Sequence, residues 1–340
     1  MGLVGYAPTT FRMSSEHSTI ELKAQNFSQL NKNYKIAVLL PCCNEEATIA
    51  SVTKDFKQHI PQSLVYVYDN NSSDNTVENA KQAGAIVRYE PIQGKGNVVR
   101  RMFADIEADI FVMSDGDGTY DVSDSASLVK QLIGEQLDMI VGVRVPDEGA
   151  HRKGHSIGNF IFNKIILFIF EDKYTDVFSG YRIFSKRFVK TFPAISKGFE
   201  IETEICIHAL DLDIPSKEVP VRYTKRVAGS ESKLKTFSDG FRILRAIINM
   251  FKEVKPFTFF NFIAMVFMIS GLILGYPLII TWMETGTVPR IPTAIIVMGL
   301  IVLSSICVTC GLVLDCVAKG RKEAKRLSYL IFPVTPKEDS

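Results

Sequence analysis

The sequence predicts an α/β domain built on a mostly parallel sheet, followed by interfacial helices and two transmembrane helices. Between residues 34 and 143, apolar runs of strand length alternate with segments of helical spacing. This alternation is typical of βαβ units. Further on, residues 256–283 and 291–314 contain no Asp, Glu, Lys or Arg. Each segment exceeds the roughly 20 apolar residues that cross a bilayer core.

Composition narrows the class of protein before any motif is considered. The chain has 340 residues, of which 46% are hydrophobic, and this content excludes an intrinsically disordered chain. Its net charge of +2 gives no case for nucleic-acid binding, which relies on a concentrated basic surface. Residues 1–33 are polar and lack the apolar core of a secretory signal. We therefore expect a flexible N-terminal extension there.

The elements of the sheet domain follow from short apolar runs and the segments between them. The first run, YKIAVLLP, is continuously apolar from its third residue onward, as in a strand buried on both faces. We expect strands at residues 34–41, 64–68, 85–89, 110–114 and 139–143. The intervening segments have helical spacing, and we expect helices at residues 45–58, 74–83, 96–108 and 123–134.

Polar groups follow three of the predicted strands. Glu45 follows the first, Asp69 the second, and Asp115-Gly116-Asp117 the fourth. Ligands of parallel sheets bind at the carboxyl ends of the strands, so these side chains are expected on one rim. Magnesium takes one or two carboxylates plus phosphate oxygens, which fits Asp115 and Asp117. The alternative for this pair is a solvated Asp-Gly turn.

Further candidate residues carry positive or negative charge elsewhere in the sequence. Lys95 lies between two glycines at a helix start, which suits a phosphate or nucleotide contact, although the spacing is not that of a Walker loop. A flexible turn is the alternative for Lys95. Four further cations could bind a lipid head group or a diphosphate: Arg144, Arg182, Arg226 and Lys233. For each of them, the alternative is a solvated cation in a loop. Among Glu200, Glu202 and Glu204, one is a candidate base or acceptor ligand, and salt bridging is the alternative.

The region after residue 235 is predicted to lie at and in a membrane. Residues 236–255 have apolar side chains at helical spacing with interleaved Arg and Lys, as in a helix lying on a membrane surface or packed on the domain. Residues 158–170 are apolar but too short to span. Residues 256–318 are predicted to form a hairpin of two spans. Basic residues flank the hairpin and recur in the tail, residues 319–340, which places both termini in the cytosol.

Taken in order, these motifs resemble family 2 glycosyltransferases of the GT-A fold, which is Rossmann-like. The resemblance covers about residues 34–251 and rests on four runs: PCCNE at 41–45, Asp69 with Ser73-Asp74, Gly94-Lys95-Gly96, and Asp115-x-Asp117. Two later runs, SGYR at 179–182 and RxxG with SKL at 226–234, resemble the polyprenyl-phosphate branch. That branch includes GtrB-like and dolichol-phosphate mannose synthase-like enzymes. The resemblance implies a GT-A domain at residues 34–235.

The resemblance also implies a role for each matched residue. Asp115 and Asp117 would hold the nucleotide and a divalent metal, Mg²⁺ or Mn²⁺, and with Arg182 they are the predicted catalytic residues. In donor binding, the nucleoside pocket would be lined by Pro41, Cys43 and Glu45, with Asp69 contacting the base and Lys95 supporting the pocket. Asp115 and Gly116 of the acidic motif are also implied in donor binding, and donor or acceptor phosphate would be bound by Arg144, Arg182, Arg226 and Lys233.

The implied activity is transfer of a sugar, with inversion, from a nucleotide-sugar to polyprenyl (undecaprenyl or dolichyl) phosphate, for cell-envelope or glycan modification. Asp69 is followed by Asn70 where the family often has a second Asp, and the spacing from Gly229 to Ser232 is one residue longer than in the mannose synthases. Both departures favour a UDP-hexose, such as UDP-glucose, over GDP-mannose. The alternatives are a GDP-mannose enzyme, a transferase for another acceptor, and an inactive membrane scaffold. The resemblance also implies a homo-oligomer, with a tetramer favoured.

Overall fold

The computed structural model describes residues 34–146, 174–224, 226, 245, 248–249 and 251–336. They fall into two compact units. The α/β unit contains the described residues up to Arg226 together with residues 331–336, and the hairpin unit contains those from Arg245 to Leu330. Predictions for residues 1–33, 158–170 and Lys233, and for most of residues 236–250, lie outside the described residues.

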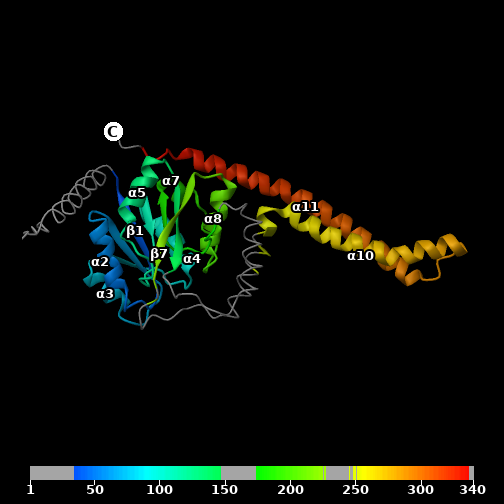
Figure 1. Cartoon of the computed structure of the whole chain (residues 1–340), viewed down its shortest axis with the longest axis horizontal. Helices are drawn as coiled ribbons and strands as arrows, with labels where there is room; N and C mark the ends of the chain where they lie inside the picture. The colour runs from blue at the N-terminus through cyan, green and yellow to red at the C-terminus, as the bar shows by residue number, and fades with distance from the viewer. Residues whose placement is uncertain are drawn as a thin grey trace, which may run out of the picture. The chain divides into compact units, whose positions relative to one another are not determined.

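The α/β unit is built on one seven-stranded sheet in the order β3-β2-β1-β4-β6-β5-β7 (Figure 1). Only β6 runs antiparallel to its neighbours β4 and β5. The strands are β1 (Ile36–Cys42), β2 (Leu64–Asp69), β3 (Ile86–Tyr89), β4 (Ile110–Met113), β5 (Met139–Pro146), β6 (Arg182–Ser185) and β7 (Ser216–Tyr223). The mostly parallel sheet expected from the sequence is confirmed.

The helices of this unit connect the strands. They are α2 (Ile49–His59), α3 (Thr76–Gln82), α4 (Lys95–Asp105), α5 (Ser125–Gly134), α7 (Lys186–Thr191) and α8 (Ile201–Asp211). The first four match the predicted helices, although α2 begins four residues later than expected because residues 43–48 form a loop at the strand end. Periodic patterns are weaker after residue 143, and β6, α7, α8 and β7 do not follow from them.

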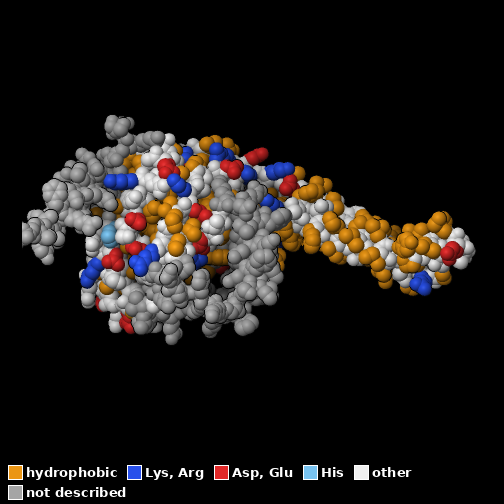
Figure 2. Space-filling view, in the orientation of Figure 1, with side chains coloured by type: hydrophobic (Ala, Val, Ile, Leu, Met, Phe, Trp, Pro, Cys, Tyr) orange, Lys and Arg blue, Asp and Glu red, His pale blue; other side chains and the backbone are white. Residues whose placement is uncertain are grey.

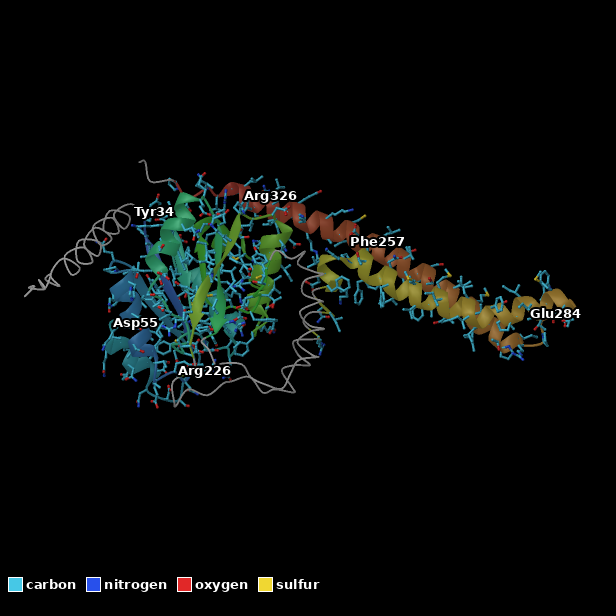
Figure 3. All side chains as sticks on the ribbon, viewed as in Figure 1. Tyr34, Asp55, Arg226, Phe257, Glu284 and Arg326 are labelled. Carbon is cyan, nitrogen blue, oxygen red and sulfur yellow. The ribbon has the colours of Figure 1, made fainter. Side chains whose placement is uncertain are left out.

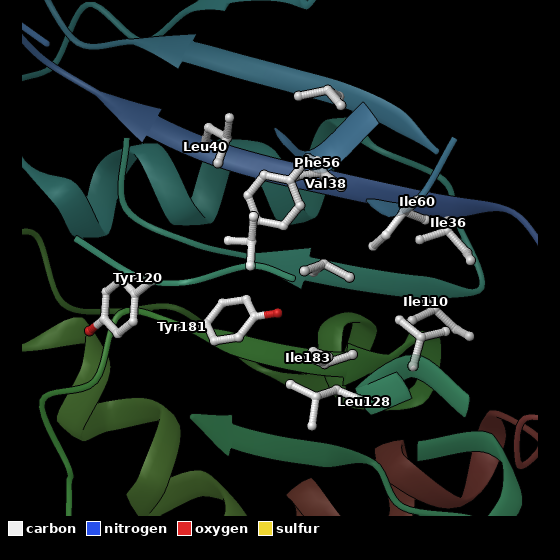
Figure 4. Close-up of a cluster of buried hydrophobic side chains, with 14 of the residues drawn as sticks. Ile36, Val38, Leu40, Phe56, Ile60, Ile110, Tyr120, Leu128, Tyr181 and Ile183 are labelled. Carbon is white, nitrogen blue, oxygen red and sulfur yellow. The ribbon is translucent and has the colours of Figure 1, made fainter. Parts of the chain in front are cut away.

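The core of the α/β unit lies on β1 and the helix packed against it. Val38 and Leu40 are fully buried, as the continuous apolar run predicted. Figure 4 shows their side chains gathered with Phe56 of α2 and with Tyr181, which precedes β6. The Tyr181 hydroxyl lies 2.7 Å from the Ser125 hydroxyl, so its polar end is satisfied inside the core. This packing fixes the strands whose carboxyl ends carry the polar groups.

The hairpin unit contains two long helices, α10 (Pro256–Thr285) and α11 (Ile291–Ile331), which run side by side. Ser304 of α11 donates to the Ala264 carbonyl of α10 at 2.8 Å. Small residues allow the close approach: a Cβ on Gly275 would meet Val297 at 3.3 Å, and one on Gly311 would meet Phe260 at 3.1 Å.

Most apolar side chains of the hairpin face outward. Figure 2 shows them along the visible face of the hairpin. Among the described residues, α10 and α11 are the two helices long and apolar enough to cross a membrane. A core helix of a soluble protein would bury such side chains. In Figure 3, Phe257 and Arg326 lie toward one end of the hairpin and Glu284 at the other. Helix α11 continues to Ile331, so the predicted boundary at residue 318 does not coincide with the end of a helix.

Candidate active site

The carboxyl ends of β1 and β2 meet in register, as the parallel sheet requires. Cys42 lies opposite Asp69, and the Asn70 amide donates to the Cys42 carbonyl at 2.8 Å. The loops that follow are tied together by Asn44, whose amide donates to the Ser72 hydroxyl at 2.8 Å. Asn44 has a φ of 53°, a left-handed conformation that asparagine tolerates better than most residues. This part of the predicted rim is therefore a defined, hydrogen-bonded surface.

The residues expected to line a nucleoside pocket lie at the ends of these two strands and in the loop after β1. Asp69 is buried, and its carboxylate accepts two long bonds from the Ser72 amide, both at 3.3 Å. Glu45 is also buried, whereas Pro41 and Cys43 are partly exposed. The structure brings these four residues to one end of adjacent strands. Whether each contacts a nucleoside stays a prediction.

Asn70 stands where the family often has a second aspartate, and its contacts require a side chain that both donates and accepts hydrogen bonds. Its side-chain amide donates to the carbonyls of Glu90 at 2.8 Å and Ile92 at 3.0 Å, and its oxygen accepts from the Gly94 amide at 2.8 Å. An aspartate accepts but does not donate when ionised. Asn70 therefore holds the loop that leads to Lys95.

The acidic motif after β4 is held by two cations. Asp115 Oδ1 lies 2.5 Å from Lys95 Nζ. Asp117 Oδ2 lies 2.8 Å from an Arg226 guanidinium nitrogen, and its other oxygen accepts from the Thr119 hydroxyl at 2.6 Å. In Figure 3, Arg226 lies at the opposite end of the sheet from Tyr34, which precedes β1. Arg226 is therefore at the carboxyl ends of the parallel strands, beside Asp117.

Glycines shape this motif from both sides. A Cβ on Gly116 would meet the Cys42 sulfur at 2.5 Å, and one on Gly180 would meet the Asp115 carboxylate at 2.3 Å. The Gly180 amide donates to the hydroxyl of the buried Tyr120 at 2.8 Å. The SGYR turn thus packs directly against the acidic motif, a contact that the sequence alone did not indicate.

Lys95 lies at the first turn of α4 and points into a charge cluster. Its Nζ contacts Asp115 and, at 2.6 Å, Glu202 Oε1 of α8. Burial opposes the charge on Lys95, but the two carboxylates outweigh it and raise the pKa of Lys95 above its usual range. Burial also raises the pKa of Glu202, although the charge of Lys95 opposes this. Of the three alternating glutamates noted in the sequence, Glu202 is the one that reaches the site.

The flanking glycines explain how Lys95 is directed. A Cβ on Gly94 would meet the Lys197 carbonyl oxygen, and one on Gly96 would meet that of Ser196, each at 2.2 Å. Gly94 also has a φ of 132°, which favours glycine. The two glycines let α4 start directly against the 196–197 backbone, so the motif is neither a flexible turn nor a free loop.

Arg182 is placed differently from the expectation of a catalytic contact. Its side chain has 0% exposure and donates to the carbonyls of Ser179 at 3.0 Å and Val177 at 2.7 Å. A side chain with no exposed surface has no access to a bound ligand in this conformation. We therefore assign Arg182 to holding the 177–182 segment that packs on Asp115, in place of the expected contact with substrate.

Arg144 is likewise engaged by the protein. It forms a bidentate pair with Asp176, with nitrogen–oxygen distances of 2.8 and 2.6 Å, and lies 5.6 Å from the centre of the Tyr223 ring. Burial opposes its charge, but the bonds to Asp176 raise the pKa of Arg144 above its usual range. Arg144 therefore joins β5 to the segment before β6, and its expected contact with phosphate stays a prediction.

The acidic motif fits a divalent metal shared with a diphosphate. Within the described residues, His, Cys, Asp and Glu side chains form no cluster of three or more that would enclose an ion by themselves. A hard cation that is also bound by phosphate oxygens needs only one or two carboxylates. Asp115 and Asp117 provide these oxygens, and each already attracts a cationic side chain.

Comparison with known proteins places this site in a family. Residues 37–192 match the model of Glycosyl transferase family 2. The chain is 52% identical over 125 residues to Protein RfbJ of Shigella flexneri, which covers 36% of this chain and 97% of that protein. It is 33% identical over 250 residues to Glycosyltransferase AglJ of Haloferax volcanii, which covers 73% of this chain and 82% of that protein. The chain belongs to glycosyl transferase family 2.

Solved structures agree on the fold of this family 2 enzyme. Mycobacterium tuberculosis glucosyl-3-phosphoglycerate synthase aligns with a TM-score of 0.53 and 19% identity, covering 67% of this chain and 83% of that one. A complex of that protein with Mn²⁺, UDP-glucose and phosphoglyceric acid aligns with a TM-score of 0.52 and 20% identity, covering 66% and 82%. The likeness confirms the GT-A fold expected from the sequence, and the family assignment confirms that the chain is a glycosyltransferase.

Proposed function

We propose that this family 2 glycosyltransferase moves a hexose from a nucleotide-sugar to a polyprenyl phosphate, with inversion at the anomeric carbon. A UDP-hexose such as UDP-glucose is the favoured donor, with Mg²⁺ or Mn²⁺ as the metal. The observation that carries the acceptor is the outward-facing apolar hairpin in the same chain as the transferase unit. A polyprenyl acceptor stays in the bilayer, and a membrane-spanning hairpin keeps the enzyme beside it.

The chemistry of the acceptor suits a site without a strong base. By analogy with phosphorylated side chains, its second pKa is roughly 6, so it is largely dianionic near neutral pH. A phosphate oxygen attacks the anomeric carbon, and the bond to the donor's diphosphate breaks with its electron pair leaving on the diphosphate. A divalent ion, when bound, supplies charge neutralisation at that leaving group. Asp115 and Asp117 would hold the metal and the donor's diphosphate, and we expect Arg226 to move its contact from Asp117 to a phosphate.

The proposed arrangement in the membrane follows from the positions of basic residues. We propose an integral membrane protein with two spans in the cytoplasmic membrane, with both termini and the transferase unit in the cytosol. The charged cluster at 319–326 follows the second apolar segment, whereas the loop at 284–290 carries one basic residue. A homo-oligomer, with a tetramer favoured, is part of the same proposal. An epitope inserted after Gly286 should be reached by antibody only from outside the sealed cell.

The reaction is tested with detergent-purified protein and a panel of UDP- and GDP-sugars. Each donor is supplied with Mg²⁺ or Mn²⁺, with and without undecaprenyl or dolichyl phosphate, and nucleotide release and lipid product are measured. We expect release with one UDP-sugar only when lipid phosphate is present, and none with Asp117→Ala. Product from GDP-mannose would instead establish the mannose synthase alternative. Nucleotide binding without any lipid product would refute the polyprenyl-phosphate acceptor.

The scaffold alternative has a separate test in cells. A scaffold that has lost catalysis needs the fold but not the acidic motif. Asp117→Ala should abolish the cellular glycan phenotype if the chain acts as an enzyme. An unchanged phenotype with normal protein level would favour the scaffold.

A further inference from the structure

Glu202 is a buried acidic residue next to the acidic motif but outside it. It lies on the first turn of α8, is 4% exposed, and its Oε1 lies 2.6 Å from Lys95 Nζ. The same Nζ lies 2.5 Å from Asp115 Oδ1. One ammonium group therefore bridges two carboxylates that come from elements far apart in the sequence.

The two carboxylates differ in their access to solvent. The Asp115 side chain is 29% exposed, whereas the Glu202 side chain is 5% exposed. A ligand arriving from solvent reaches Asp115 but not Glu202. If Asp115 turns to a ligand, Lys95 loses one of its two partners and keeps the other. A buried ammonium without a partner is costly, so the retained partner decides whether Lys95 stays in place.

The backbone around Glu202 holds this partner at a fixed distance. Glu204, on the same helix, accepts from the amides of Ile195 at 2.9 Å and Ser196 at 2.7 Å. The start of α4 packs through Gly94 and Gly96 against the carbonyl groups of residues 196 and 197. The N-termini of α4 and α8 are therefore joined through one loop, and Lys95 and Glu202 project from this joined structure.

We propose that Glu202 is a positioning residue of the donor site, anchoring Lys95 from the protein side so that Asp115 is released to engage the donor. This inference rests on the proposed function. When the donor binds, Lys95 moves one contact from Asp115 to the donor's diphosphate and keeps its contact with Glu202. Without Glu202, the lysine depends on Asp115 alone, and that ion pair competes with donor binding.

The test measures binding of UDP with Mn²⁺ by calorimetry to the detergent-purified full chain. Glu202→Gln keeps the shape of the side chain and removes its charge, and we expect about tenfold weaker binding from the loss of one charge-assisted bond. Glu202→Asp, which keeps the charge, should recover part of that loss. The matched control is Asp138→Asn, which breaks the buried pair of Asp138 with Arg187 at 2.5 Å. Asp138 precedes β5 and so lies at the amino end of that strand, away from the carboxyl ends that carry the acidic motif. This control should lower the unfolding temperature without changing affinity for UDP.

A double variant tests whether Glu202 acts through Lys95. In the Lys95→Met background, Glu202→Gln should cause no further loss of affinity, because the partner it anchors is gone. Equal affinity of wild type and Glu202→Gln would overturn the inference, as would a full second loss in the double variant. Should Glu202→Gln fail to fold, Glu202→Asp and the double variant, which removes both charges of the Lys95–Glu202 pair, carry the same test. Absence of nucleotide binding in the wild type would instead refute the proposed function.

Discussion

Gly180 provides the sharpest test of how the SGYR turn shapes the acidic motif. A Cβ at this position would lie 2.3 Å from Asp115 Oδ2 and 2.7 Å from its Cγ, whereas ordinary contacts begin at 3.4 Å. In Gly180→Ala, the carboxylate must therefore move by about 1 Å. Asp115 is partly exposed, so it has room to rotate away from Lys95. The variant changes the position of one carboxylate while leaving its charge in the protein.

The expected magnitude follows from this displacement. Misplacing a reacting or binding group by about 1 Å costs up to roughly 100-fold in rate. Overpacking typically lowers the free energy of unfolding by about 1–3 kcal/mol. Turnover of the donor identified in the panel should fall by one to two orders of magnitude, with weaker UDP–Mn²⁺ affinity. Both are measured beside the unfolding temperature, so that a loss of folded protein is separated from a loss of function.

Gly134→Ala is the matched control. Apart from its chain neighbours and the backbone of its own helix, no heavy atom lies within 4 Å of a Cβ built on Gly134, at the end of α5. This variant should keep full affinity and change stability by no more than about 1 kcal/mol. Wild-type turnover and affinity in Gly180→Ala would refute the reasoning, since they would mean that the position of Asp115 does not matter to the donor.

Three other predictions concern the hydrogen bonds of Asn70, the divalent metal and the carboxylate of Asp121. Asn70→Asp removes two donated hydrogen bonds to the 90–92 loop and should lower the free energy of unfolding by about 1–3 kcal/mol, measured by denaturant titration, and an unchanged midpoint would contradict this. Chelation with EDTA should abolish donor turnover, which added Mn²⁺ restores in wild type but not in Asp117→Ala; turnover that survives chelation would exclude metal dependence. The Ser123 amide lowers the pKa of Asp121, so the carboxylate stabilises the fold above its unfolded pKa of about 3.9 and loses this effect as the pH falls through the lower, folded pKa. Asp121→Asn should therefore flatten the decline in stability at acidic pH, and an identical decline would contradict the assignment.

The sequence by itself determined the α/β class, the first five strands, the helices between them and the two long apolar helices. These features depend on local periodicity, because a buried parallel strand is a short apolar run and a membrane span is a long one. The rim of Asp69, Asp115 and Asp117 also followed from the sequence. Parallel strands place their carboxyl ends together, so residues after each strand become neighbours without any knowledge of side-chain packing.

Only the tertiary structure decided which protein group each of these charged side chains contacts. Arg182 and Arg144 were expected at phosphates, yet Arg182 is buried against backbone carbonyls and Arg144 is paired with Asp176. The sequence does not distinguish Glu202 from Glu200 and Glu204, whereas in the structure α8 places Glu202 against Lys95. Local patterns identify a charge but not its partner, because a partner is set by contacts between segments distant in the chain. The antiparallel strand β6 was not predicted for the same reason, since its pairing with β4 and β5 depends on contacts between distant segments.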